Sequence, residues 1–164
     1  MQMTKTAAVA TDLLVGIGAG LVAGWAMNLF QSAWITISEE PEPEETAASR
    51  AADAVSEDLS DAAIKKSKKK TADSVIHYLT AALMGGAYGL VGGRFPRLFM
   101  ADGLLFGGLI WVIADELAVP ALRLGPPPEK VGFKDHALGL SSHLVFGVVL
   151  DLVRRKTNEV ISPR

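Results

Sequence analysis

The sequence contains no cysteine, and this absence excludes several kinds of chemistry. Disulfide bonds, thiol nucleophiles and cysteine-ligated metals are all ruled out. Positive charge is not in excess either, because 16 Lys and Arg stand against 18 Asp and Glu, for a formal net charge of −2. A chain with this balance has no broad basic field that would attract nucleic acid, so we expect no nucleic-acid partner.

Charge is also missing from long stretches of the chain. The first runs from Leu13 to Ile37 without a charged residue. As an α-helix it would extend roughly 37 Å, which is enough to cross a ~30 Å hydrocarbon core with some tilt. The stretch is longer than the apolar part of a signal peptide, and no clear cleavage site follows it. We therefore interpret it as an uncleaved membrane helix.

Three further apolar stretches predict additional membrane helices. The four predicted spans cover residues 13–37, 74–93, 103–121 and 137–153. The third contains Asp115 and Glu116, and the last two have short charge-free cores that would also suit buried helices of a soluble bundle. Because the first span argues strongly against a soluble bundle, we predict an all-α, polytopic integral membrane protein whose single membrane domain covers residues 1–164.

A charged segment, residues 39–73, separates the first two predicted spans. It opens with acidic and proline residues and closes with a run of lysines. Between these ends, apolar residues recur at helical spacing: Ala48, Ala52, Val55, Leu59 and Ala62. This stripe predicts an amphipathic helix at about 46–64 that lies on the membrane surface or against a partner. A solvated helix that packs on nothing is the alternative.

The basic residues give only weak guidance on membrane orientation. An even number of spans puts both chain termini on one side, here called side A, and residues 39–73 on the opposite side B. Basic residues are divided almost equally between the two sides, but they flank the spans more tightly on side A. We therefore expect both chain termini on the cytoplasmic side of the membrane.

Glycine is concentrated in the predicted spans. Eight glycines form overlapping G-x-x-x-G steps: Gly16, Gly20, Gly24, Gly85, Gly89, Gly93, Gly103 and Gly107. Such steps let helix backbones approach closely, and in lipid van der Waals contact then drives helix association. Repeated steps in three spans predict a compact bundle or an oligomer.

Polar residues inside the spans converge on side B. The set consists of Gln31, His77, Asp115, Glu116, His136 and His143. Because successive spans run in opposite directions, connectivity alone places all six in the side B half of the bundle. An ionisable residue within a span costs free energy and marks a functional hypothesis, here proton relay or cation binding. The structural alternative is that these side chains pair with one another to fix helix register.

We predict no metal site, no cofactor and no enzymatic activity. Two histidines and two carboxylates are chemically able to hold a first-row metal. However, no E-x-x-H or H-x-x-x-H pair is present, and the candidate ligands come from three helices. The sequence Gly139-Leu-Ser-Ser-His143 also fails to match a nucleophile elbow.

Short motifs in the last three spans suggest a family. They are His77-Tyr78 with Met84-Gly85-Gly86-Ala87-Tyr88-Gly89, Gly107 with Trp111, Asp115-Glu116 and Pro120, and Ser142-His143-Leu144 with Gly147 and Arg154-Arg155. These motifs resemble the YagU-like family of small bacterial inner-membrane proteins. The resemblance covers roughly residues 74–156 plus the first span, and implies four membrane helices without an established activity or cofactor. It adds emphasis to His77, Glu116 and His143.

Two functions are compatible with these features. The first is a structural or accessory component that lies in the bilayer and packs through its glycine faces with itself or with a larger membrane complex. The alternative is a transport protein that handles protons or other ions through the His/Asp/Glu cluster.

Overall fold

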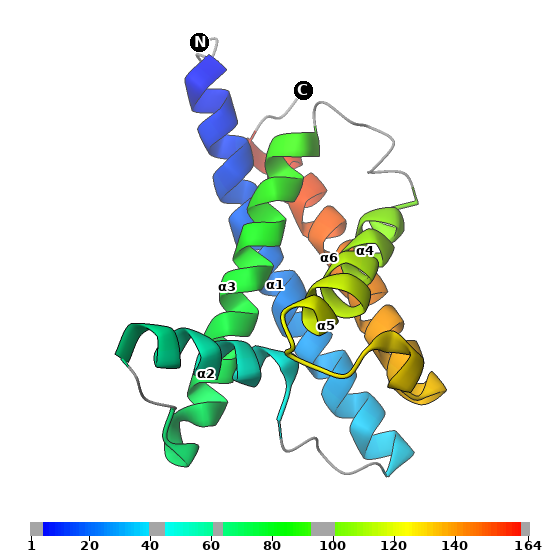
Figure 1. Ribbon diagram of the computed structural model, residues 1–164. Helices are drawn as coiled ribbons and strands as arrows, with labels where there is room; N and C mark the ends of the chain where they lie inside the picture. Colours follow the sequence, from blue (N-terminus) through cyan, green and yellow to red (C-terminus); the bar gives the residue numbers. More distant parts are fainter. Residues whose placement is uncertain (1–4, 40–44, 61–63, 93–100, 162–164) are drawn as a thin grey trace.

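The chain folds into helices joined by short connections (Figure 1). The computed structural model describes residues 5–39, 45–60, 64–92 and 101–161, and no strand occurs among them. The elements are α1 (Lys5–Ser38), α2 (Ala47–Ser60), α3 (Lys66–Gly92), α4 (Leu104–Trp111), the π-helical segment η2 (Val112–Ala118), α5 (Val119–Ala121), the 3-10 turn η3 (Pro128–Lys130) and α6 (Phe133–Ile161). Four continuous stretches are long and apolar enough to cross a membrane: Lys5–Ser38, Lys66–Gly92, Leu104–Ala121 and Phe133–Ile161. The prediction of an all-α, polytopic fold is confirmed.

Several helices extend beyond the predicted spans. Helix α1 begins at Lys5, α3 begins at Lys66 within the charged segment 39–73, and α6 continues to Ile161. The apolar pattern marks only the part of a helix that suits hydrocarbon. Alanine, lysine and arginine are good helix formers, so the same helices can continue into the aqueous phase.

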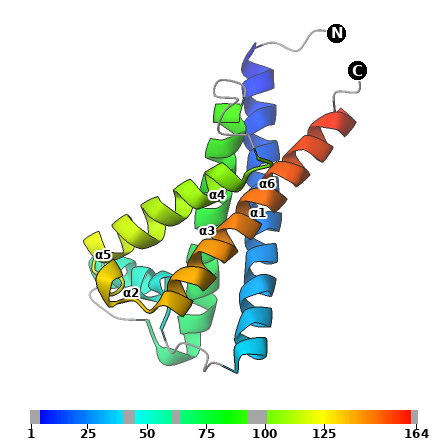
Figure 2. The same ribbon diagram turned by 90° about the vertical axis from the view of Figure 1, so that its right-hand side faces the viewer.

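Helix α1 lies in the middle of the bundle, packed against α3 and against α6, while α4 packs on α6 (Figures 1 and 2). Helix α1 begins and α6 ends at the same end of the bundle, side A, and α2 and α5 lie toward the opposite end (Figures 1 and 2). The buried apolar core consists of Ala19, Ala23, Met27, Ala81, Tyr88, Ile110, Phe146 and Leu150. Many large apolar side chains on the outer faces are exposed, which suits contact with lipid.

Helix α2 packs against α3 near side B. It ends earlier than the predicted helix 46–64, and residues 61–63 lie outside the described part of the chain. Its buried face carries Ser49 and Ala52, whereas Val55 from the predicted apolar stripe is 52% exposed. The helix is therefore held against the protein itself, through a narrower face than the sequence pattern indicates.

The glycine stripes of α1 and α3 face each other at backbone distance. A Cβ atom added at Gly16 or Gly20 would collide with the α3 backbone, and one at Gly85 or Gly89 would collide with the α1 backbone. Gly93 lies outside the described residues. The two stripes are therefore covered by each other within one chain, which is the compact bundle of the two arrangements that the sequence left open.

Helices α4 and α6 make a second contact of the same kind. Cβ atoms at Gly103 and Gly107 would collide with the α6 backbone, and one at Gly147 would collide with the start of α4. Gly103 also has a φ of +84°, a left-handed conformation that favours glycine at the start of α4. Gly24 of the first stripe faces the Ala81 side chain of α3 rather than its backbone.

Candidate functional site

Four of the six predicted polar residues form two histidine–carboxylate pairs between η2 and α6. Glu116 Oε1 lies 2.9 Å from His136 Nδ1, and Asp115 Oδ2 lies 3.6 Å from His143 Nδ1. The other ring nitrogen of His136 lies 3.1 Å from the carbonyl oxygen of Pro128. Helix α6 supplies both imidazoles and η2 supplies both carboxylates, so the pairs also connect the third and fourth spans.

The wide turn of η2 brings the two adjacent carboxylates toward α6. Pro120 lacks a backbone N–H, and in a regular helix its ring would clash with the carbonyl four residues earlier, that of Glu116. The π-helical segment comes directly before this proline, and π-helical turns occur frequently at functional sites. Gly139 makes room on the facing side, since a Cβ there would lie 3.1 Å from Asp115 Oδ2.

Two spaces lie on either side of the Asp115–His143 pair. The outer pocket has a volume of about 240 Å³ and includes Asp115, Glu116, Asp135 and His136 in its walls. The remaining wall of this pocket is formed by Ala47, Trp111, Val119, Pro126, Pro128 and Val131. Three carboxylates around one pocket create an environment that attracts cations.

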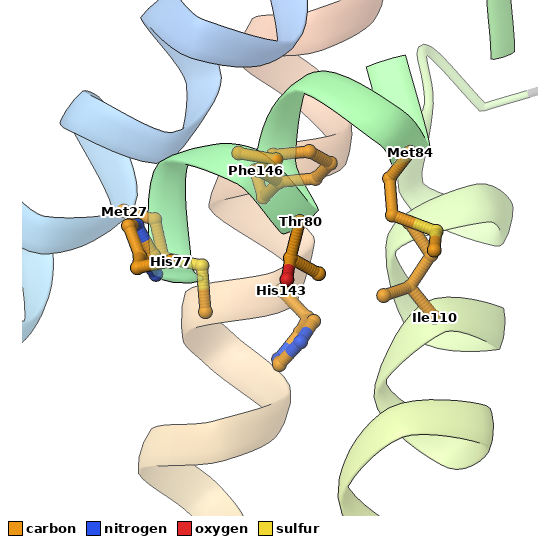
Figure 3. Close-up of a pocket in the computed structure, with 8 residues that line it drawn as sticks. Met27, His77, Thr80, Met84, Ile110, His143 and Phe146 are labelled. Carbon is orange, nitrogen blue, oxygen red and sulfur yellow. The ribbon is translucent and has the colours of Figure 1, made fainter. Parts of the chain in front are cut away.

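The inner cavity is smaller, about 80 Å³, and lies between α1, α3, α4 and α6. It is lined by Met27, His77, Thr80, Ala81, Met84, Ile110, His143 and Phe146 (Figure 3). His143 is 9% exposed and faces this cavity, while its Nδ1 faces the Asp115 carboxylate of the outer pocket. The Asp115–His143 pair is thus the polar link between the two spaces.

The other two predicted polar residues lie apart from these pairs. His77 reaches the same inner cavity as His143, but its Nε2 lies 3.1 Å from the carbonyl oxygen of Gly24 and its ring packs edge-on against Tyr78. Gln31 is half-buried on α1, and among the described residues it forms no hydrogen bond or ion pair with the cluster. No group of three or more His, Asp or Glu side chains in the described ranges is arranged to hold a metal ion.

A second polar network lies near side A, outside the set of polar residues that the sequence singled out. The Tyr88 hydroxyl donates a 2.9 Å hydrogen bond to Asp151 Oδ1, and Arg155 Nε lies 3.0 Å from Asp151 Oδ2. Asp151 is only 1% exposed. The i, i+4 spacing of Asp151 and Arg155 is a sequence signal for this pairing, but nothing in the pattern identified Tyr88 as the third member.

Ion pairs also hold α2 against α3. Lys69 of α3 lies 2.6 Å from Glu45 Oε1 and 2.8 Å from Asp53 Oδ2, and Arg50 of α2 donates a 2.9 Å hydrogen bond to the carbonyl oxygen of Leu124. The hydrogen bond from Lys69 lowers the pKa of both the Glu45 and the Asp53 carboxyl. Helix α2 therefore bridges the start of α3 and the chain after α5.

Acid is expected to loosen α2. Both carboxyls have folded-state pKa values below their ordinary 4.5 and 3.8, so their contribution is complete at neutral pH and is lost as the pH falls through the lowered values. Since the chain has no native cysteine, spin labels at Val55→Cys and Val75→Cys report the α2–α3 distance directly. The distance distribution should broaden at pH 3 relative to pH 7. The additional change Lys69→Met should broaden it already at pH 7, and a distribution unchanged by either treatment would contradict the ion-pair account.

Comparison with known proteins adds a family but no function. Residues 40–152 match a family described as a protein of unknown function (DUF1440). This range contains both histidine–carboxylate pairs and all of the inner-cavity lining except Met27. No curated protein and no solved structure is significantly similar to the chain. The likeness to YagU-like proteins and the bacterial location stay predictions.

Proposed function

Because this chain belongs to the DUF1440 family, whose function is unknown, we propose a function from the arrangement of its polar residues. The protein is a small integral membrane protein that transports cations. Cations enter from side B through the outer pocket and pass the Asp115–His143 pair to reach the inner cavity.

The observation that carries this proposal is the position of the Asp115–His143 pair between the two spaces. The outer pocket supplies carboxylates at the end of the bundle, where a cation arrives with its water. The inner cavity has room for a small ion or a few waters, since one water occupies about 30 Å³ in the liquid. A buried imidazole beside a carboxylate is costly within a membrane span and is typical of ion and proton pathways.

A structural or accessory role is the weaker candidate. It rested on glycine faces, but those faces are covered within the chain. What favours it is the third span, which packs mainly on α6 and leaves a row of large apolar side chains exposed: Leu105, Leu109, Val112, Ile113 and Leu117. The native mass of protein extracted gently from its own membrane distinguishes the roles, because an accessory subunit co-purifies with a defined partner.

Transport can be tested with the intact protein in liposomes. An inside-negative potential is imposed, and uptake of protons, K⁺, Tl⁺, Ag⁺, Mn²⁺ and Zn²⁺ is measured in parallel, by an enclosed pH dye for protons and by elemental analysis for metals. At least one cation should accumulate faster than in protein-free liposomes. Asp115→Asn should lower that rate about tenfold, since it removes the carboxylate charge beside His143 that attracts the cation. A tenfold change corresponds to about 1.4 kcal/mol, which one charge near a protein surface can supply.

The matched control is Glu159→Gln on α6. Glu159 is exposed and, in the part of the chain that the structure describes, pairs only with Lys156 near side A, so removing its charge should leave the uptake rate unchanged. Uptake of every tested cation at the protein-free rate would overturn the transport proposal.

A further inference from the structure

The inner cavity gathers a thioether and two imidazoles from three different helices. We propose that Met27, His77 and His143 form a binding site for a soft monovalent metal ion of the Cu(I) or Ag(I) class. This metal ion would be the cation that the protein transports, and to that extent the inference rests on the proposed transport function. Figure 3 shows Met27 of α1 beside His77 of α3, with His143 of α6 facing them from below.

The hydrogen bonds of the two histidines leave one nitrogen of each ring available as a ligand. A backbone carbonyl only accepts, so His77 Nε2, 3.1 Å from the Gly24 oxygen, carries the proton in the neutral ring. In the same way His143 Nδ1, 2.9 Å from the Gly139 oxygen, carries its proton. The opposite nitrogens, Nδ1 of His77 and Nε2 of His143, hold lone pairs. Metal-binding histidines have this arrangement, in which the second nitrogen donates to a carbonyl or carboxylate.

The chemistry of the lining favours a soft ion. Thioether sulfur prefers Cu(I), and imidazole also suits copper, whereas Mg²⁺ and Ca²⁺ require several oxygen ligands. Thr80 supplies the only side-chain oxygen among the described residues that line the cavity. The sequence predicted no metal site, because the spacing of histidines and carboxylates does not reveal a methionine ligand on another helix.

The charge around the cavity favours a monovalent ion. All three proposed ligands are neutral, and the nearest carboxylate, that of Asp115, lies 3.6 Å from His143. One negative charge beside the site balances one positive charge within it. A divalent ion would keep an uncompensated charge in a low-dielectric interior, which is strongly unfavourable.

The cavity also provides an internal control. The sulfur of Met84 lies on the other side of the cavity, next to Ile110 and away from His77 (Figure 3). Met27→Leu and Met84→Leu are therefore the same substitution in the same cavity, but only the first removes a proposed ligand. Met27 is 8% exposed, so the leucine side chain keeps the site filled with apolar atoms of similar volume.

Binding is measured on the full-length protein in detergent. Ag⁺ is titrated by calorimetry, and Cu(I) is titrated anaerobically against a coloured chelator. We expect one ion per chain, with affinity at least tenfold weaker in Met27→Leu and in His143→Gln and unchanged in Met84→Leu. Loss of a residue that only hydrogen-bonds to a metal ligand already weakens metal binding 10- to 100-fold, so loss of a direct ligand should do at least as much. X-ray absorption of the Cu(I)-loaded wild-type protein should show sulfur and nitrogen neighbours, which tests the site even if a variant does not fold.

The outcomes separate this inference from the transport proposal. No Ag⁺ or Cu(I) binding by the wild-type protein, equal binding by Met27→Leu, or an absorption spectrum without sulfur would overturn the metal site. Uptake of another cation without Ag⁺ binding would overturn the metal site and leave transport standing. Ag⁺ binding at Met27 without uptake of any cation would overturn transport and leave the metal site standing.

Discussion

Gly85→Leu is expected to cause a large loss of stability. The Cβ of the new side chain would collide with the backbone of Gly16 and lie against Gly20, and backbone cannot move aside as the tip of a flexible side chain can. Overpacking of this kind typically costs about 3 kcal/mol at its upper range. We expect a loss of that size or greater, measured as a shift of the unfolding midpoint in mixed detergent micelles.

Gly18→Leu is the control for this effect. Gly18 lies on α1 between the two glycines that contact α3, but a Cβ there would meet nothing within 4 Å. The leucine would point into lipid, so the midpoint should stay within about 0.5 kcal/mol of the wild type. Equal unfolding midpoints for Gly85→Leu and the wild-type protein would show that α1 and α3 do not pack through these glycines.

Asp151→Ala is expected to have the second large effect, also on stability. The carboxylate of Asp151 accepts the Tyr88 hydroxyl and pairs with Arg155, and it is almost fully buried. Removing it takes away one of the two carboxylates that pair with Arg155 and the 2.9 Å hydrogen bond of the Tyr88 hydroxyl. Arg155 is 46% exposed and keeps Asp102, so we expect the loss of one buried, charged hydrogen-bond acceptor, about 1.5–3 kcal/mol, measured as a shift of the unfolding midpoint.

Asp102→Ala tests whether the loss of stability in Asp151→Ala results from the burial of the Asp151 carboxylate. Asp102 also pairs with Arg155, at 2.8 Å, but its side chain is 70% exposed. Exposed ion pairs contribute about 0–1 kcal/mol, so this variant should unfold close to the wild type. If the two alanine variants lose similar stability, the buried network at side A is not what holds α3 and α6 together there.

The sequence was sufficient for the parts of the fold that depend on local composition. A run such as 13–37 must be a helix in lipid, because every backbone polar group in hydrocarbon needs a partner within its own segment. Glycine spacing likewise located the close helix contacts. It could not tell whether Gly16 and Gly85 would meet each other or another chain, since that depends on which helices become neighbours.

The two histidine–carboxylate pairs were predictable only in part, because their formation also depends on how neighbouring helices face each other. Connectivity predicted that His143 and Asp115 lie in the same half of the bundle. It did not predict that they pair, because their pairing depends on the wide turn of η2 and on the space beside Gly139. Connectivity predicts the depth of Gln31, but depth does not fix the direction in which a side chain points around its helix. Tyr88 was not identified as a polar partner because Asp151 is 63 residues away in sequence.

The two close helix contacts through glycine, α1 with α3 and α4 with α6, also bear on the order in which the helices pack during synthesis. Each joins spans that are consecutive in the chain. The first pair has its whole interface once Gly92 has left the ribosome, before the third span has emerged from it. Chains generally fold from the N-terminus as they are synthesised. The order of membrane insertion therefore matches the order of packing, and the inner cavity is completed last, when α6 brings His143 to it.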